Sequence, residues 1–227
     1  MPRNSLFTTA VVFTYMLLAQ FIQAQDNNMT IGLIGDSTVA TTYGWGPAFA
    51  SRVKGQVTVL NYAKNGATLD SLSKKLDALL KEKPNYVIIQ FGHNDMKRYD
   101  PKVYGEKLKG YIERIIRAGS KPIVFSSVTR RNFDEKGKIK PTVFNERILP
   151  TYALSAKTIA KETHSLFLDL NAISIEHHNR IGPEESHTYN FKSKDTTHFS
   201  KKGAKEIANL IIKELKITIP ALDEYWK

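Results

Sequence analysis

A serine follows a short apolar run near the start of the chain. Residues 31–35 are Ile-Gly-Leu-Ile-Gly, and Asp36 and Ser37 come directly after them. Such a run favours a buried strand of a parallel sheet, and Gly35 with Asp36 indicates a sharp turn at its end. Ligands of open α/β sheets bind just beyond the carboxyl ends of the strands, so Ser37 is a candidate nucleophile. The alternative is a turn serine that caps the next helix.

A serine hydroxyl needs a base, and one histidine has an acid at a suitable distance. Asp195 precedes His198 by three residues. In a turn, this spacing brings the carboxylate close to the imidazole. The carboxylate can then fix the tautomer that leaves Nε2 free to accept the proton of Ser37. The alternative is an aspartate that caps the following helix, with a histidine that only stands beside it.

Two further residues could stabilise the negative charge that builds on the oxygen of an attacked ester. Asn94 follows an apolar run at residues 86–91, and Gly66 follows another at residues 57–61. The Asn94 amide and the N–H groups of Gly66 and Ser37 would form an oxyanion hole, worth about 10²–10³ in rate per donor. The alternatives are an ordinary turn glycine and an asparagine that caps its own loop.

These residues depend on strands and helices that alternate along the chain, an order that favours a parallel sheet with crossover helices. The runs expected to form strands lie at residues 31–35, 57–61, 86–91, 122–127 and 166–170. Helical signals, including caps at Asp100 and Ser200, lie at residues 46–52, 72–80, 101–118, 150–162 and 201–215. Residues 128–147 and 182–199 show no period, and connections of this length are often functional.

Composition limits the classes of function. The chain has 227 residues, which suits one domain, and 41% of them are hydrophobic, enough for a core. It has no cysteine, which excludes disulfides, a thiol nucleophile and cysteine-ligated metals. The net charge is +11, and it reflects either a solvated lysine-rich surface or attraction to an acidic partner such as a polyuronate. The lysines are scattered and do not form a basic tract with interleaved aromatic residues, which argues against nucleic acid as the partner.

The first 24 residues have the pattern of a signal peptide. Arg3 precedes an apolar stretch from Leu6 to about Ala19, and Ala24 is a small residue at a suitable cleavage point. The stretch is shorter than the roughly 20 apolar residues that span a bilayer, and the alternative is an uncleaved anchor. We therefore expect a secreted or periplasmic protein, with one domain at residues 25–227 and no stable membrane insertion after cleavage. Its net charge falls to +10, because Arg3 is the only charged residue removed.

The candidate residues lie in four blocks that resemble those of the SGNH branch of the GDSL esterase/lipase superfamily. The blocks are Gly-Asp-Ser-Thr at 35–38, Asn61 with Ala63 and Gly66, Gly-His-Asn-Asp at 92–95, and Asp-Thr-Thr-His-Phe-Ser at 195–200. Within the superfamily, the chain resembles the rhamnogalacturonan acetylesterase group. Gln90-Phe91 and Arg-Arg-Asn-Phe-Asp at 130–134 add to this likeness, which covers about residues 30–215. One departure is Ala67, with Leu69 close by, where we expect a basic or polar residue.

The resemblance implies a flavodoxin-like three-layer α/β/α sandwich with a five-stranded parallel sheet. It implies that Ser37 attacks an ester, that His198 and Asp195 act as base and orienting acid, and that Gly66 and Asn94 complete the oxyanion hole. No metal or other cofactor is implied. The implied substrate is an acetylated plant polysaccharide of the pectin or rhamnogalacturonan type. We expect the protein to be a monomer.

Three other functions stay open from the sequence. They are a lipase or thioesterase for longer acyl chains, an acetylxylan esterase, and a carbohydrate-binding protein without activity. The complete set of candidate catalytic residues argues against the last. An α/β-hydrolase is disfavoured because the chain lacks G-x-S-x-G around Ser37, and because only three residues separate Asp195 from His198.

Arg130 and Arg131 form a pair in the long segment after the fourth expected strand. Arginine binds carboxylates through two parallel hydrogen bonds, so the pair is a candidate site for the uronate groups of an acidic polysaccharide. The alternative is that both arginines form ion pairs with local acids such as Asp134 and Glu135.

Overall fold

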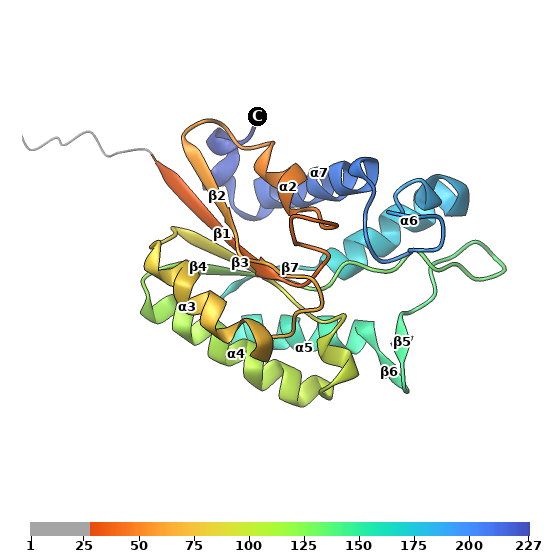
Figure 1. The fold of residues 1–227 in the computed structure, drawn as a ribbon, viewed down its shortest axis with the longest axis horizontal. Helices are drawn as coiled ribbons and strands as arrows, with labels where there is room; N and C mark the ends of the chain where they lie inside the picture. The colour runs from red at the N-terminus through yellow and green to blue at the C-terminus, as the bar shows by residue number, and fades with distance from the viewer. Residues whose placement is uncertain (1–27) are drawn as a thin grey trace, which may run out of the picture.

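Five parallel strands form the central sheet in the order β2-β1-β3-β4-β7 (Figure 1). The strands are β1 (Met29–Gly35), β2 (Val57–Asn61), β3 (Tyr86–Gln90), β4 (Lys121–Phe125) and β7 (Leu166–Leu168). This computed structural model describes residues 28–227, so the predicted signal peptide at residues 1–24 lies outside the described residues. All five expected strands are present, and their order is the doubly wound, flavodoxin-like one.

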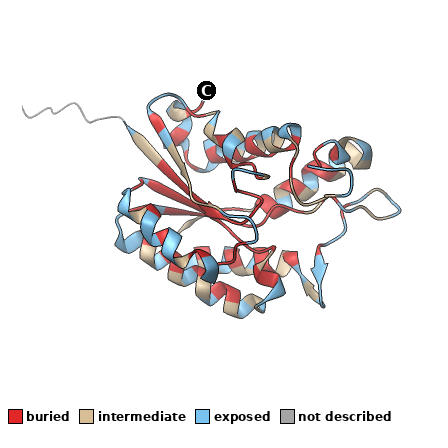
Figure 2. Cartoon of the chain, in the orientation of Figure 1, coloured by how far each residue is buried: buried red, intermediate tan, exposed pale blue. Residues whose placement is uncertain are grey.

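Helices cover both faces of the sheet (Figure 1). One face carries α2 (Gly46–Ala50), α6 (Leu170–His187) and α7 (Lys201–Thr218). The other face carries α3 (Ser73–Lys81), α4 (Pro101–Arg117) and α5 (Leu149–Glu162). A separate hydrophobic cluster fills the space on each side, and the central strands β1, β3 and β4 are mostly buried (Figure 2). The fold is therefore the predicted three-layer α/β/α sandwich.

The two predicted helix caps are confirmed. The Asp100 side chain accepts the Val103 N–H at 2.9 Å at the start of α4, and Pro101 occupies the first helical position. The Ser200 hydroxyl accepts the Gly203 N–H at 3.1 Å at the start of α7. Among the described residues, we find no helix with both the length and the apolar character needed to cross a bilayer.

The segment expected to be irregular from Gly182 onward begins later. Helix α6 continues to His187, with a break at Gly182, whose φ is +78°, just before Pro183. Hydrophobic periodicity did not indicate this helix because much of its buried face is polar. The buried polar residues are Asn171, Ser174, His177, His178 and Ser186.

The long segment at residues 128–147 also has more structure than its sequence indicated. It ends in two short antiparallel strands, β5 (Val143–Phe144) and β6 (Arg147–Ile148), which project beside α5 (Figure 1). Asn145 and Glu146 have φ values of +44° and +67° and make the turn between them. Positive φ at both central residues is the geometry of a tight hairpin turn.

Candidate active site

Ser37 lies in the turn that follows β1, and hydrogen bonds fix this turn to the neighbouring strand. Asp36 Oδ1 accepts the N–H and the hydroxyl of Thr38 at 2.9 and 2.7 Å. Gln90 at the end of β3 donates to the Thr38 hydroxyl at 2.5 Å. Gly35 is required here, because a Cβ would come within 2.5 Å of the Gln90 carbonyl oxygen. The turn therefore presents Ser37 at the carboxyl edge of the sheet.

The fold brings Ser37 to His198, although 161 residues separate them. Ser37 Oγ lies 2.9 Å from His198 Nε2, and His198 Nδ1 lies 2.8 Å from Asp195 Oδ2. Asp195 Oδ1 accepts the backbone N–H groups of Thr197 and His198 at 3.1 and 3.0 Å. Burial alone would raise the pKa of Asp195, but the hydrogen bonds from His198 and Thr197 outweigh it and lower that pKa. An ionised Asp195 suits Nδ1 as donor, which leaves Nε2 as acceptor for the Ser37 hydroxyl.

The three candidate oxyanion donors lie on loops that follow neighbouring strands. Gly66 has a φ of +73°, a conformation that favours glycine, and an added Cβ would meet no neighbouring atom. Glycine is therefore needed here for its backbone conformation and not for lack of space. Within residues 28–227, neither the Ser37 N–H nor the Gly66 N–H donates an intramolecular hydrogen bond. The Asn94 amide donates to the Ala67 carbonyl at 3.1 Å and has a second hydrogen to offer. Because β2, β1 and β3 are adjacent and parallel, these groups gather at one edge of the sheet.

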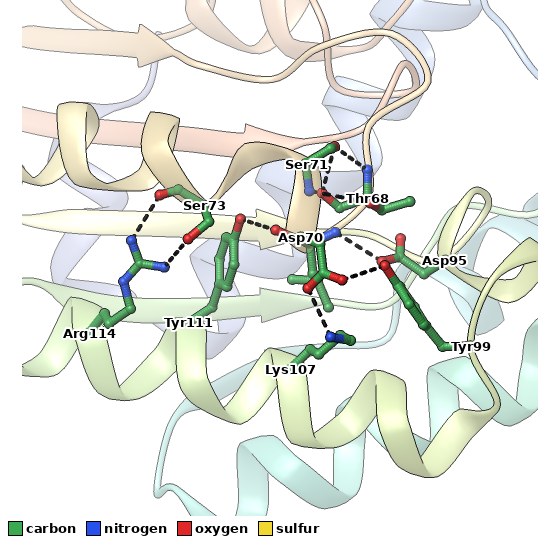
Figure 3. Close-up of polar contacts among 10 residues, drawn as sticks. Thr68, Asp70, Ser71, Ser73, Asp95, Tyr99, Lys107, Tyr111 and Arg114 are labelled. Atoms are coloured by element: carbon green, nitrogen blue, oxygen red, sulfur yellow. Dashed lines mark hydrogen bonds and ion pairs between the residues drawn. The ribbon is translucent and has the colours of Figure 1, made fainter.

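A polar network fastens the loop after Gly66 to the segments that follow β3 (Figure 3). Asp95 Oδ1 accepts the Leu69 N–H at 2.9 Å, and the Tyr111 hydroxyl donates to the Leu69 carbonyl. The Tyr99 hydroxyl donates to Asp70 at 2.6 Å. The loops that carry Gly66 and Asn94 are thereby joined to each other and to α4.

The family comparison agrees with this geometry. The sequence model of the GDSL-like lipase/acylhydrolase family matches residues 33–206, a stretch that includes Ser37, Gly66, Asn94, Asp195 and His198. The chain belongs to this family. Members of the GDSL-like family hydrolyse esters, and relatives of this chain are named as acetylesterases, so the chain is an ester hydrolase.

Individual relatives of this GDSL-like hydrolase refine the comparison. Rhamnogalacturonan acetylesterase RhgT from Bacillus subtilis is 35% identical over 205 residues, which are 79% of this chain and 86% of RhgT. The crystal structure of the YxiM protein from Bacillus subtilis matches with a TM-score of 0.73 and 26% identity, over 84% of this chain and 56% of YxiM. The structure of Axe2, an acetylxylan esterase from Geobacillus stearothermophilus, has the same fold, with a TM-score of 0.62 and 20% identity over 82% and 94% of the two chains.

Arg131 of this GDSL-like hydrolase does not lie where we expected it. Its side chain is fully buried, so it does not face the cleft, and the prediction that it binds substrate carboxylates is wrong. Its guanidinium donates to Asn190 Oδ1 at 2.6 Å and to the His198 carbonyl at 2.6 Å, with a longer contact of 3.4 Å to the Asp195 carbonyl. It also stacks over the Phe199 ring at 4.8 Å. Arg131 is thus a positioning residue beneath the loop that carries Asp195 and His198.

Arg130, its neighbour, lies at the site itself. Its side chain is half-buried, and its Nε has no hydrogen-bond partner among the described residues. Burial lowers the pKa of Arg130, and the nearby carboxylates of Asp195 and Asp36 oppose that effect. The positive charge of Arg130 also contributes to lowering the pKa of His93. Arg130 is thus close to the charged groups of the site, and its contact with substrate stays a prediction. Neither arginine forms an ion pair with Asp134 or Glu135.

Two other histidines near the site are held neutral. His93 Nε2 lies 2.9 Å from the Val128 carbonyl, and burial lowers the pKa of His93 to about 3. His178 Nδ1 lies 2.9 Å from the Ser186 hydroxyl. Burial lowers the pKa of His178 to about 3, with a contribution from the charge of Arg131. His93 thereby joins the segment after β3 to the segment after β4, whereas His178 joins two parts of α6 across its break at Gly182.

The sequence did not indicate the buried position of Arg131 or the contact between Tyr43 and His198. The Arg-Arg pair drew attention to Arg131, but nothing in the sequence named Asn190 or the His198 carbonyl as its partners. The Tyr43 ring lies 5.3 Å from the His198 ring, and its only signal was a position shortly after Ser37. Within residues 28–227, no group of three or more histidine or carboxylate side chains is placed to hold a metal ion.

Proposed function

We propose that the protein is a serine acetylesterase. His198 Nε2 accepts the proton of Ser37 as Oγ attacks the ester carbonyl, and Asp195 holds the imidazole in place. The N–H groups of Ser37 and Gly66 and the Asn94 amide hold the oxyanion. As the bond between the carbonyl carbon and the sugar oxygen breaks, His198 gives the proton to that oxygen. The sugar leaves with a free hydroxyl, and the acetyl group stays on Ser37 Oγ. Water, activated by the same histidine, releases acetate and restores the serine.

The observation that carries this proposal is the continuous set of hydrogen bonds from Ser37 through His198 to Asp195, at 2.9 and 2.8 Å. The test compares kcat/KM on p-nitrophenyl acetate with that on octanoate and palmitate esters, and Ser37→Ala is the background control. We expect the acetate ester to be cleaved fastest. Faster cleavage of the longer esters would identify a lipase or thioesterase instead, and no activity on any ester would leave a binding protein.

For the natural substrate, we propose an acetylated plant polysaccharide of the pectin or rhamnogalacturonan type. The 35% identity to RhgT over 79% of this chain supports this choice, since RhgT is a rhamnogalacturonan acetylesterase. The half-buried guanidinium of Arg130 beside Asp195 is suited to a uronate carboxylate or a sugar hydroxyl. Secretion or export to the periplasm fits a polymeric substrate and rests on the signal-peptide pattern of residues 1–24.

Acetate release from matched polysaccharides tests the substrate. Acetylated pectin rich in rhamnogalacturonan should be deacetylated faster than acetylated xylan, which is mostly neutral. Arg130→Ala should raise KM on the pectic substrate more than KM on p-nitrophenyl acetate, because the small ester has no carboxylate. Faster release from xylan would replace the pectic substrate with a neutral one, and the chain would then be an acetylxylan esterase.

A further inference from the structure

A groove of about 530 Å³ adjoins His198. It lies between the segment after β1, helix α2 and the first turns of α7. The Tyr43 ring lines this groove and lies 5.3 Å from the His198 ring. Phe199, also in the lining, donates its N–H to the Tyr43 carbonyl at 3.0 Å. The groove and the Ser37–His198 pair therefore share a wall.

The charge of the groove has one sign. Arg52, Lys201 and Lys205 line it, and no carboxylate does among the described residues. Both lysines are exposed, and neither forms an ion pair within residues 28–227. Lys202 points elsewhere from the same helix turn and pairs with Glu185 at 2.6 Å. The unpaired cations of this turn are thus the ones that face the groove.

The positions of Lys201 and Lys205 are unfavourable for α7 itself. They are four residues apart on one face of the helix, where like charges repel. They also occupy its first turns, where the positive end of the helix dipole disfavours cations, and the first turn has no acidic residue. Breaks in local preference of this kind are expected at functional sites. A bound anion would relieve both conflicts at once.

We propose that this groove is a subsite for a carboxylate-bearing sugar residue of the substrate chain. The inference rests on the proposed function, because an acetylated polysaccharide with its ester at Ser37 extends past His198 and over Tyr43. The carboxylate of the neighbouring residue then lies between Lys201 and Lys205, and the apolar face of its ring packs on Tyr43. The cationic groove thus selects acidic over neutral chains.

Inhibition of p-nitrophenyl acetate hydrolysis by sugars without acetyl groups tests this subsite. Oligogalacturonate is the acidic probe, and a xylo-oligosaccharide of equal length is the neutral one. Lys201→Gln with Lys205→Gln should raise the Ki of the acidic probe about 3–10-fold more than that of the neutral probe. Sodium chloride at about 0.5 M should remove most of this difference by screening. As a matched control, Lys74→Gln with Lys75→Gln removes the same charge from the exposed face of α3 and should leave both Ki values unchanged.

Three results would overturn the proposal. They are equal Ki values for the two probes with the wild-type protein, an unchanged Ki ratio in the groove variant, and an equal rise in the α3 control. The last would mean that overall charge, rather than the groove, attracts the acidic sugar. Failure of the proposed function gives a different result, because the wild-type protein would then release no acetate from acetylated pectin, whatever the inhibition constants.

Discussion

Replacing Arg131 with methionine should lower turnover more than substrate affinity. Methionine fills a similar apolar volume but removes the hydrogen bonds to Asn190 Oδ1 and to the His198 carbonyl, both 2.6 Å long. The loop that carries Asp195 and His198 is then free to shift relative to Ser37. Because a displacement of about 1 Å can cost up to 10² in rate, we expect kcat to fall about 10–100-fold with a small change in KM.

The cost to the fold should be smaller than the number of lost hydrogen bonds indicates. Two bonds from a charged donor are worth about 3–6 kcal/mol together. Burial opposes this gain, because it disfavours the charged form and lowers the pKa of Arg131 from 12.5 to about 10, so the loss should lie at the lower end of that range or below it. The net loss of unfolding free energy should be about 2 kcal/mol, or roughly 4–8 °C in Tm for a domain of this size.

Steady-state kinetics on p-nitrophenyl acetate and a thermal melt measure both effects. Arg131→Lys keeps the charge, but one ammonium group cannot reproduce the planar fork, so kcat should stay low. Arg114→Met is a matched control, because Arg114 also makes three bonds, to Ser73 Oγ at 3.0 Å, the Ser73 carbonyl at 2.8 Å and Asp77 at 2.5 Å. It holds the first turn of α3 on the opposite face of the sheet. A lower Tm with wild-type kcat in Arg131→Met would refute the positioning role and leave only a structural one.

Three further predictions concern the reacting groups and a buried acid. Ser37→Ala and His198→Ala should each remove nearly all activity while Tm stays within a few degrees, because the catalytic residues act as a unit. Asp195→Asn should lower activity somewhat less. Wild-type turnover in Ser37→Ala would exclude the mechanism. Asn94→Ala should lower kcat about 10²–10³-fold with little change in KM, and a change confined to KM would assign Asn94 to substrate binding. Burial raises the pKa of Asp95 from 3.8 to about 7, so the folded protein keeps a proton that the unfolded chain has released. The stability that Asp95 contributes is therefore lost as pH rises from about 4 to about 7. The side chain introduced by Asp95→Asn does not titrate, so the unfolding free energy of the variant minus that of wild type should increase over this range in urea titrations. A constant difference between the two proteins would show that Asp95 is ionised in the fold.

The fold was predictable because its signals are local. Each strand of the sheet is an apolar run, and Asp100 and Ser200 cap their helices within three residues. Helix α6 escaped prediction because His177, His178 and other polar residues occupy its buried face. Their hydrogen bonds depend on partners elsewhere in the fold, and hydrophobic periodicity does not register them.

The catalytic residues of the candidate site could be predicted from the sequence, but the surroundings of the site could not. The blocks around Ser37 and His198 are contiguous in sequence, so their residue types and spacing could be recognised. Ala67 and Leu69 stood out as departures from the expected polar pattern, and both are buried in the core on the α3–α5 face. Their apolar character therefore serves packing, and it carries no direct information about the substrate.

Arg130 and Arg131 show why the residues that hold the catalytic loop in place could not be predicted. Neighbouring side chains in an extended chain point to opposite sides, so the two arginines need not serve one function. Arg130 is half-buried beside Asp195, whereas Arg131 is fully buried against the carbonyl side of the same loop. Substitutions should therefore separate the pair kinetically on a pectic substrate. Arg130→Ala should act mainly on KM and Arg131→Met mainly on kcat, and the same pattern in both variants would show that the two arginines act as one element after all.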